Sequence, residues 1–393
     1  MSGPARTAKS ARTLHSRRLY FVYFTSYLGW RDNPVLEGKS LVVCNWTLAI
    51  YAIHLSYGHT ILCKSISAAT IKQYVLAAAS LIAQFRTDTI DPRCHSATSK
   101  EFAPCLDGVF KELIRYEKVP NRREPLTMEM IECLYQRNKQ ACRFSTHLDV
   151  LLYHWFVIGL ALGFRRIEWC QEASSANSCP ALSDPQSDNR DNLPRAFLPR
   201  DIQCFSRSKA RIPLAAAVSS PHLVDSISIK WRFQKNNENG EEKLITRSTN
   251  STPSTHCRVE SLLAILHAHL VLISPTIDPE QVIPLAVFQS DLGAPTYITN
   301  WDVTGMLRSL AAEVYNLNPS VKADQEQLRR WSCHSIRVGA CVLLHAMGFS
   351  ATDIQFLLRW KSDAFMAYLR NLSFLSRRHA DAIDRAAAIP NFI

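Results

Sequence analysis

The most informative stretch of this chain is residues 331–372, WSCHSIRVGACVLLHAMGFSATDIQFLLRWKSDAFMAYLRNL. His334 and Arg337 open an apolar run that predicts a helix, and a second apolar run ends at Trp360. Tyr368 follows Trp360 by eight residues. The stretch therefore carries an imidazole, a guanidinium group, an indole and a phenol. These side chains bind anions, move protons or attack as nucleophiles.

An arginine motif lies upstream, at the end of an apolar helix predicted over 147–162. It reads Gly163-Phe-Arg165-Arg166-Ile-Glu168. Arg165 and Arg166 compete for the role of anion-binding arginine, and the spacing to Glu168 favours Arg165. We expect Glu168 to orient or support its neighbours rather than to react.

A lysine motif, Gln234-Lys235-Asn236-Asn237, lies between two predicted strands. The first strand is indicated by the alternation of apolar Ile227, Ile229, Trp231 and Phe233 with polar residues. Asn239-Gly240 tolerates the positive φ angles of a tight turn, and 243–247 returns as the partner strand. Lys230 and Lys243 compete with Lys235, whose asparagine neighbours suit a hairpin tip.

None of these motifs is specific alone, since His15-Ser-Arg-Arg18 repeats the His-x-x-Arg spacing near the N-terminus. Their order, Arg, Lys, His-x-x-Arg, Trp and Tyr, resembles the active site of the tyrosine recombinases, the phage integrase-like family. The step from Trp360 to Tyr368 resembles the recombinases of Crypton-like and DIRS-like mobile elements. The resemblance covers about residues 40–380 and is strongest over 331–372.

The resemblance implies a site-specific DNA recombinase that cuts and rejoins DNA through a covalent 3′-phosphotyrosine intermediate, with no metal or other cofactor. Two guanidinium forks would neutralise a phosphate, the imidazole would shuttle a proton, and the lysine would protonate the leaving 5′-oxygen. The implied catalytic residues are Arg165, Lys235, His334, Arg337, Trp360 and the nucleophile Tyr368, with Glu168 supporting them.

The predicted fold is mainly α with a small antiparallel β-sheet. A charged, proline-bearing stretch over 117–125 reads as a linker between two domains. We expect a basic, partly disordered N-terminal arm over 1–39, a helical DNA-binding (core-binding) bundle over 40–116, a catalytic recombinase domain over 126–382 and a tail over 383–393. The resemblance implies that the two domains clamp a DNA duplex.

The composition favours a folded protein with a polyanionic partner. The chain has 393 residues, 47% of them apolar, and a net charge of +11. No segment has the length and apolar character of a membrane span. Double-stranded DNA is the expected partner. The candidate phosphate contacts are Lys64, Lys72, Arg122, Arg123, Lys230 and Arg232.

The twelve cysteines form no Cys-x-x-Cys pair and no cluster at zinc spacing. Their mostly apolar neighbours predict reduced, buried thiols in an intracellular protein, without disulfides or a structural metal. The first acidic residue is Asp32, and the basic segment before it resembles an organelle transit peptide or an arm that lies on DNA.

Three alternatives compete with the recombinase hypothesis. They are a DNA-binding protein of the same fold that does not cut, a type IB topoisomerase-like enzyme, and a helical scaffold with a basic surface and no chemistry. The last of these predicts that the six candidate catalytic residues lie far apart. The resemblance further implies a homotetramer on DNA and location in the nucleus, with an organelle as the alternative.

Overall fold

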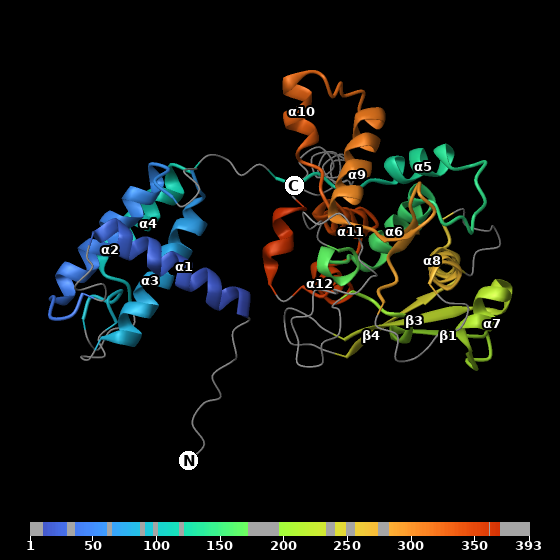
Figure 1. Cartoon of the computed structure of the whole chain (residues 1–393), viewed down its shortest axis with the longest axis horizontal. Helices are drawn as coiled ribbons and strands as arrows, with labels where there is room; N and C mark the ends of the chain where they lie inside the picture. The colour runs from blue at the N-terminus through green and yellow to red at the C-terminus, as the bar shows by residue number, and fades with distance from the viewer. Residues whose placement is uncertain are drawn as a thin grey trace, which may run out of the picture. The chain divides into compact units, whose positions relative to one another are not determined.

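The computed structural model describes residues 11–29, 36–60, 65–86, 91–96, 101–117, 122–171, 196–232, 240–248, 256–273, 283–360 and 362–369. The chain divides into two compact units, Met1–Asn121 and Arg122–Ile393 (Figure 1). The division falls within the stretch predicted to be a linker, 117–125. Proline and charged residues predominate in that stretch, and Val119 is its one aliphatic residue besides proline.

The described part of the N-terminal unit is helical. Two of its helices begin at serine caps, Ser40 and Ser67, whose hydroxyl groups accept backbone N–H donors that a helix start leaves free. Its core is formed by fully buried side chains such as Leu48, Val75 and Leu106. The helices are α1 (Ala11–Leu28), α2 (Leu41–Ser56), α3 (Ala68–Phe85) and α4 (Pro104–Arg115).

Helix α1 lies within the segment expected to be an arm. Tyr20 stacks on Tyr74 with ring centroids 3.8 Å apart, and the fully buried Phe24 contacts the ring of Tyr51. Burying several aromatic rings offsets the entropy lost when this segment is ordered. The second half of α1 is therefore part of the bundle core, which differs from the arm predicted over 1–39.

The C-terminal unit contains the remaining elements. Its helices are α5 (Met128–Arg137), α6 (Leu148–Leu162), α7 (Leu214–Ser219), α8 (Arg258–Leu272), α9 (Asn300–Val314), α10 (Lys322–Leu328), α11 (His334–Ala346) and α12 (Ala351–Leu358). Its short 3-10 helices are η1 (Arg166–Glu168), η2 (Pro199–Asp201), η3 (Pro221–Leu223) and η4 (Asp363–Ala367). Its strands are β1 (Ile202–Phe205), β2 (Arg211–Ile212), β3 (Ser226–Trp231), β4 (Glu241–Thr246), β5 (Val287–Gln289) and β6 (Pro295–Tyr297).

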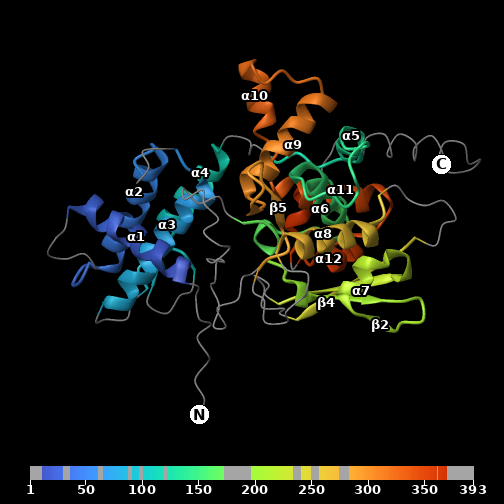
Figure 2. The same ribbon diagram turned by 45° about the vertical axis from the view of Figure 1, so that its right-hand side comes forward.

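A small antiparallel sheet of order β2-β1-β3-β4 lies at one end of this unit, opposite α9 and α10 (Figures 1 and 2). Strands β3 and β4 pair with Ile227 opposite Ile245 and Trp231 opposite Glu241. The expected fold class, mainly α with a small antiparallel sheet, is confirmed. Strands β1, β2, β5 and β6 have two to four residues each, too few for an alternating pattern to be visible in the sequence.

Helix α6 is the centre of the core, since every residue from Val150 to Leu160 is buried. A helix that is apolar on all sides must be covered on all sides. Helix α11 approaches α6 closely, and a Cβ atom added at Gly159 would lie 2.5 Å from Cγ2 of Ile336. At Gly339 an added Cβ would lie 2.3 Å from the carbonyl oxygen of Leu126.

We expect Gly339→Ala to lower the free energy of unfolding by about 1–3 kcal/mol, because the methyl group collides with backbone rather than with a movable side chain. The matched control is Gly305→Ala in α9, where an added Cβ meets nothing within 4 Å. That change should raise the stability slightly, by up to about 1 kcal/mol, through helix propensity. Urea unfolding measures the change in the free energy of unfolding for both variants. Equal changes would show that the close approach of Gly339 to the Leu126 carbonyl does not constrain the packing.

Candidate active site

The arginine motif follows the end of α6. Gly163 ends the helix with φ of 58°, a left-handed conformation that glycine adopts easily, and the chain turns there into η1. This turn directs Arg165 and Glu168 back toward the end of α12. Arg165 is partly buried, whereas Glu168 is only 3% exposed.

The carboxylate of Glu168 has donors on several sides. It accepts hydrogen bonds from Nη1 of Arg165 at 3.0 Å, from both terminal nitrogens of Arg359 at 3.2 and 3.0 Å, and from Nε1 of Trp231 at 3.2 Å. Burial opposes ionisation, but the charges and hydrogen bonds of Arg359 and Arg165 outweigh it and lower the pKa of Glu168. The Glu168 carboxylate is therefore ionised, and both of its oxygens accept hydrogen bonds.

Arg337 is 2% exposed and lies between the ends of two helices. Its guanidinium donates to the carbonyl of Gly163 at the end of α6 and to that of Leu358 at 2.7 Å, at the end of α12. It also lies 4.2 Å from the ring centroid of Trp360. Burial and the nearby charge of Arg165 lower its pKa to about 9, so it is still a cation at neutral pH.

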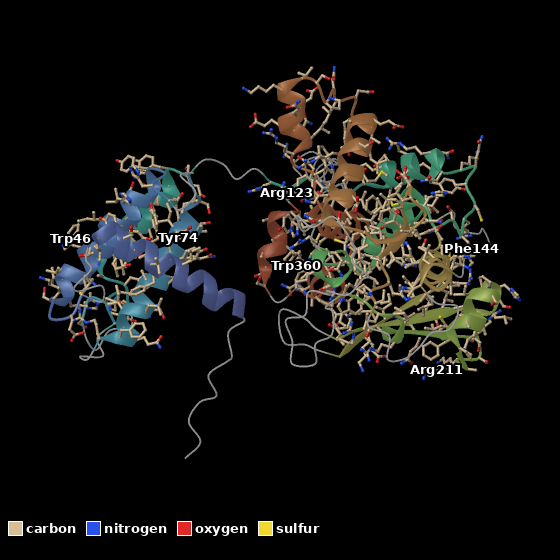
Figure 3. The ribbon with its side chains drawn as sticks, in the orientation of Figure 1. Trp46, Tyr74, Arg123, Phe144, Arg211 and Trp360 are labelled. Carbon is tan, nitrogen blue, oxygen red and sulfur yellow. The ribbon has the colours of Figure 1, made fainter. Side chains whose placement is uncertain are left out.

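Tyr368 and His334 meet beside this cation. The phenol oxygen of Tyr368 lies 2.8 Å from Nε2 of His334, and the Tyr368 and Trp360 ring centroids are 5.9 Å apart. Figure 3 shows Trp360 in this region of the C-terminal unit. Tyr368 is half-buried and His334 is exposed. The reactive pair is thus accessible from solvent and Arg165 is partly so, whereas Glu168, Arg337 and Arg359 are buried behind them.

The pKa shifts of this pair determine its resting protonation state. Desolvation, with the charges of Arg337 and Arg123, lowers the pKa of His334. Burial raises the pKa of Tyr368, assisted by Cys341 and opposed by Arg337. At neutral pH the phenol therefore keeps its proton, and the neutral imidazole can accept it.

Of the residues implied by the resemblance, the structure brings together Arg165, Glu168, His334, Arg337, Trp360 and Tyr368. Lys235 lies outside the described residues. Its competitor Lys243 is committed to internal contacts, because its Nζ pairs with Glu241 at 2.8 Å and lies 4.0 Å from the ring centroid of Phe356. Lys230 is exposed on β3. Arg359 was missed, because only its neighbour Trp360 matched a motif.

The candidate DNA contacts have different surroundings. Arg122 and Arg123 are exposed, and the amine of Lys72 lies 5.3 Å from the ring centroids of Phe102 and Phe110. Lys64 lies outside the described residues. The expectation that Arg232 contacts a DNA phosphate is wrong. Its side chain is 12% exposed and donates to Asp201 at 2.6 Å and to a backbone carbonyl, so it is an internal ion pair.

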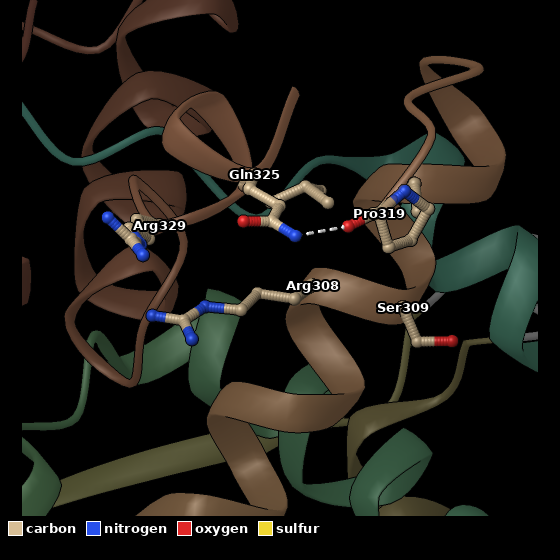
Figure 4. A pocket seen from close by; sticks show the side chains of 7 residues that line it. Arg308, Ser309, Pro319, Gln325 and Arg329 are labelled. Carbon is tan, nitrogen blue, oxygen red and sulfur yellow. Dashed lines mark hydrogen bonds between the residues drawn. The ribbon is translucent and has the colours of Figure 1, made fainter. Parts of the chain in front are cut away.

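A second group of arginines lines a cavity of about 460 Å³ beside α9 and α10. Figure 4 shows the guanidinium groups of Arg308 and Arg329 near each other, while Gln325 donates to the carbonyl of Pro319. Burial and the charges of Arg123 and Arg329 lower the pKa of Arg308. Within the described part of the chain, no carboxylate lies within 4.0 Å of the guanidinium groups of Arg123, Arg308 and Arg329. Uncompensated cations of this kind attract an anion.

Six of the ten described cysteines are buried, and all ten are free thiols. Among the described residues there is no group of three or more histidine, cysteine or acidic side chains that could hold a metal ion. No helix in the described ranges combines the length and apolarity needed to cross a membrane.

Comparison with solved structures identifies the fold. The Tn1549 transposon integrase in complex with transposon right-end DNA matches with a TM-score of 0.50 and 14% identity, over 98% of this chain and 96% of that chain. The same integrase with circular intermediate DNA matches at 0.44 and 14%, over 96% and 94%. XerA recombinase matches at 0.33 and 12%, over 95% and 93%. No protein-family model and no curated protein matches the sequence. The chain has the tyrosine recombinase fold.

We expect Glu168→Gln to lower the free energy of unfolding by about 3–5 kcal/mol, because two arginines lose their buried counter-charge. The exposed pair of Glu313 with Arg137 is the control, and Glu313→Gln should cost at most about 1 kcal/mol. Denaturant unfolding at pH 7 measures both variants. A loss for Glu168→Gln no larger than that for Glu313→Gln would contradict the supporting role.

The same carboxylate predicts an acid dependence. Its pKa is lower in the folded chain than in the unfolded chain, so its contribution is complete above about pH 4.3 and is lost as the pH falls through the folded value. Glu168→Gln should lack this part of the acid-induced loss, which unfolding curves at a series of acidic pH values will show.

Proposed function

We propose that this chain is a DNA strand-exchange enzyme in which Tyr368 attacks a backbone phosphate. The observation that carries the proposal is the 2.8 Å contact between the phenol oxygen of Tyr368 and Nε2 of His334, beside the Arg337 cation. The tyrosine recombinase fold supports it. The Tn1549 integrase, which shares this fold, was solved with DNA bound.

In the proposed reaction the phenol oxygen forms a bond to phosphorus and the bond from phosphorus to the 5′-oxygen breaks. The phenol proton passes to His334, and Lys235 supplies a proton to the leaving oxygen. Arg165 and Arg337 neutralise the charge on the non-bridging oxygens, which needs donors held in place before the reaction. A free 5′-hydroxyl of a second strand then reverses these steps and releases Tyr368.

Two narrower parts of the proposal rest on the resemblance alone. One is the assembly of four protomers on two DNA sites. The other is the relationship to the recombinases of Crypton-like and DIRS-like elements, which stays a prediction from the spacing of Trp360 and Tyr368.

The arginine group formed by Arg123, Arg308 and Arg329 extends the proposal to DNA binding. Arg123 donates to the carbonyl of Arg329 at 2.7 Å, and its charge acts on both His334 and Arg308. We propose that the DNA backbone continues from the scissile phosphate past Arg123 to the cavity, where Arg308 and Arg329 contact further phosphates.

The covalent intermediate is the direct test of the reaction. A nicked duplex library of randomised sequence traps any phosphotyrosine, which survives denaturing electrophoresis as a protein–DNA adduct. We expect an adduct from the parent chain and none from Tyr368→Phe. The control Tyr315→Phe removes another hydroxyl group of the same unit, from a ring that stacks on Trp331, and should keep the adduct.

Equal adduct levels in the parent and in Tyr368→Phe would contradict the assignment of the nucleophile. Binding of the library without any adduct would favour a DNA-binding protein of the same fold that does not cut.

The salt dependence of DNA binding tests the proposed backbone path. The double change Arg308→Ala with Arg329→Ala removes two phosphate contacts and should reduce the slope of log affinity against log salt by about 2. The control removes the same charge from exposed residues of the β1–β2 hairpin, by Arg207→Ala with Arg211→Ala. An unchanged slope in the first variant, or the same change in the control, would contradict the path.

A further inference from the structure

Arg359 has a backbone conformation that its side-chain type disfavours. It caps the end of α12 with φ of 57° and ψ of 50°. Glycine adopts this left-handed conformation readily, whereas the Cβ atom of other residues is crowded in it. Only four non-glycine residues in the described ranges have positive φ. A buried arginine at such a position needs a compensating role for its side chain.

The side chain of Arg359 joins three separate elements. Its guanidinium donates to both oxygens of Glu168 in η1, at 3.2 and 3.0 Å, and lies 4.1 Å from the ring centroid of Trp231 in β3. The side chain is 1% exposed. Both terminal nitrogens are bound to the carboxylate of Glu168, so any influence that Arg359 has on the reaction passes through its neighbours.

The backbone of Arg359 completes the arrangement. Its carbonyl oxygen accepts from Nη2 of Arg165 at 3.3 Å and from Nη2 of Arg337 at 3.5 Å. The left-handed conformation determines where this carbonyl points and in which direction Trp360 leaves the helix. One residue thus contacts both guanidinium groups that the proposed function assigns to the scissile phosphate.

We propose that Arg359 is a positioning residue that sets the spacing of Arg165 and Arg337. Its side chain holds Glu168, Glu168 holds Arg165, and its carbonyl holds both arginines from the other side. A bidentate planar cation is needed, because it must bind two carboxylate oxygens while its face packs on an indole ring. This inference rests on the proposed function only for the identity of the phosphate.

The decisive variant is Arg359→Gly. Glycine keeps the left-handed backbone without crowding and removes the guanidinium, so the variant separates the side chain from the turn. We expect DNA affinity within about twofold of the parent, since no phosphate contact is lost, and an adduct formed about tenfold more slowly or worse, since misplacement of catalytic groups is costly. Methylguanidinium in the buffer should restore part of the rate in this variant and not in the parent.

Two further variants exclude a merely structural effect. Arg247→Ala is the matched control, because Arg247 also bonds a carboxylate, that of Glu260, and backbone carbonyls, but away from the site. At equal folded fraction by circular dichroism it should form adduct at the parental rate. Arg359→Lys keeps one charge without the planar fork. We expect Arg359→Lys to fold and to form the adduct slowly. It replaces Arg359→Gly in the test if that variant does not fold.

A second readout does not depend on cleavage. Orthovanadate mimics a phosphate, and its binding can be followed through the ¹⁵Nε signals of the arginines. We expect its affinity to fall about tenfold in Arg359→Gly, as the two guanidinium groups lose their spacing. A parent without adduct would refute the proposed function, while a lower vanadate affinity in the variant would still support the positioning role. Equal vanadate affinity, or an adduct rate within about twofold of the parent, would overturn the role.

Discussion

An ionised carboxylate is stable inside a protein only when donors surround it, and Glu168 has donors from three distant parts of the chain. Arg165 follows α6, Trp231 ends β3 and Arg359 ends α12. Their shared acceptor ties the sheet to two helix ends. Movement of any one of them would remove a donor from the buried carboxylate, so Glu168 links the positions of all three.

The ends of two helices supply the other half of the site. Helices α6 and α12 both end at left-handed residues, Gly163 and Arg359, and the last carbonyls of a helix lack partners within it. Arg337 donates to carbonyls at both ends. A cation among carbonyl groups is electrostatically favourable, so the polarity that terminates these helices also holds the anion-binding arginine in place.

The site is divided into a rigid buried part and an accessible reactive part. Glu168, Arg337 and Arg359 are buried, whereas His334 and Tyr368 meet at the surface. Such a division allows the buried charges to stay preorganised while a large substrate reaches the phenol. The separate arginine group of Arg123, Arg308 and Arg329 lies in the same unit, and among the described residues no carboxylate pairs with it.

Much of the fold could be predicted, because it depends on local patterns. The apolar α6 and the β3–β4 hairpin follow from spacing and turn chemistry within a few residues. The sequence did not predict that α1 belongs to the core. Its basic residues indicate an exposed arm, although its aromatic residues pack in the bundle. The two- to four-residue strands were missed because so short a segment shows no period.

The order of amino acids specifies which side chains are available for chemistry and where along the chain they occur. The partners of these side chains follow from the packing of the folded chain. It placed Arg232 on Asp201 instead of at the surface, and it made Arg359 the link between Glu168 and the two other arginines. The physical reason is that a charge pair joining residues 168 and 359 has no local signature. It depends on how close two helix ends come after the core has packed.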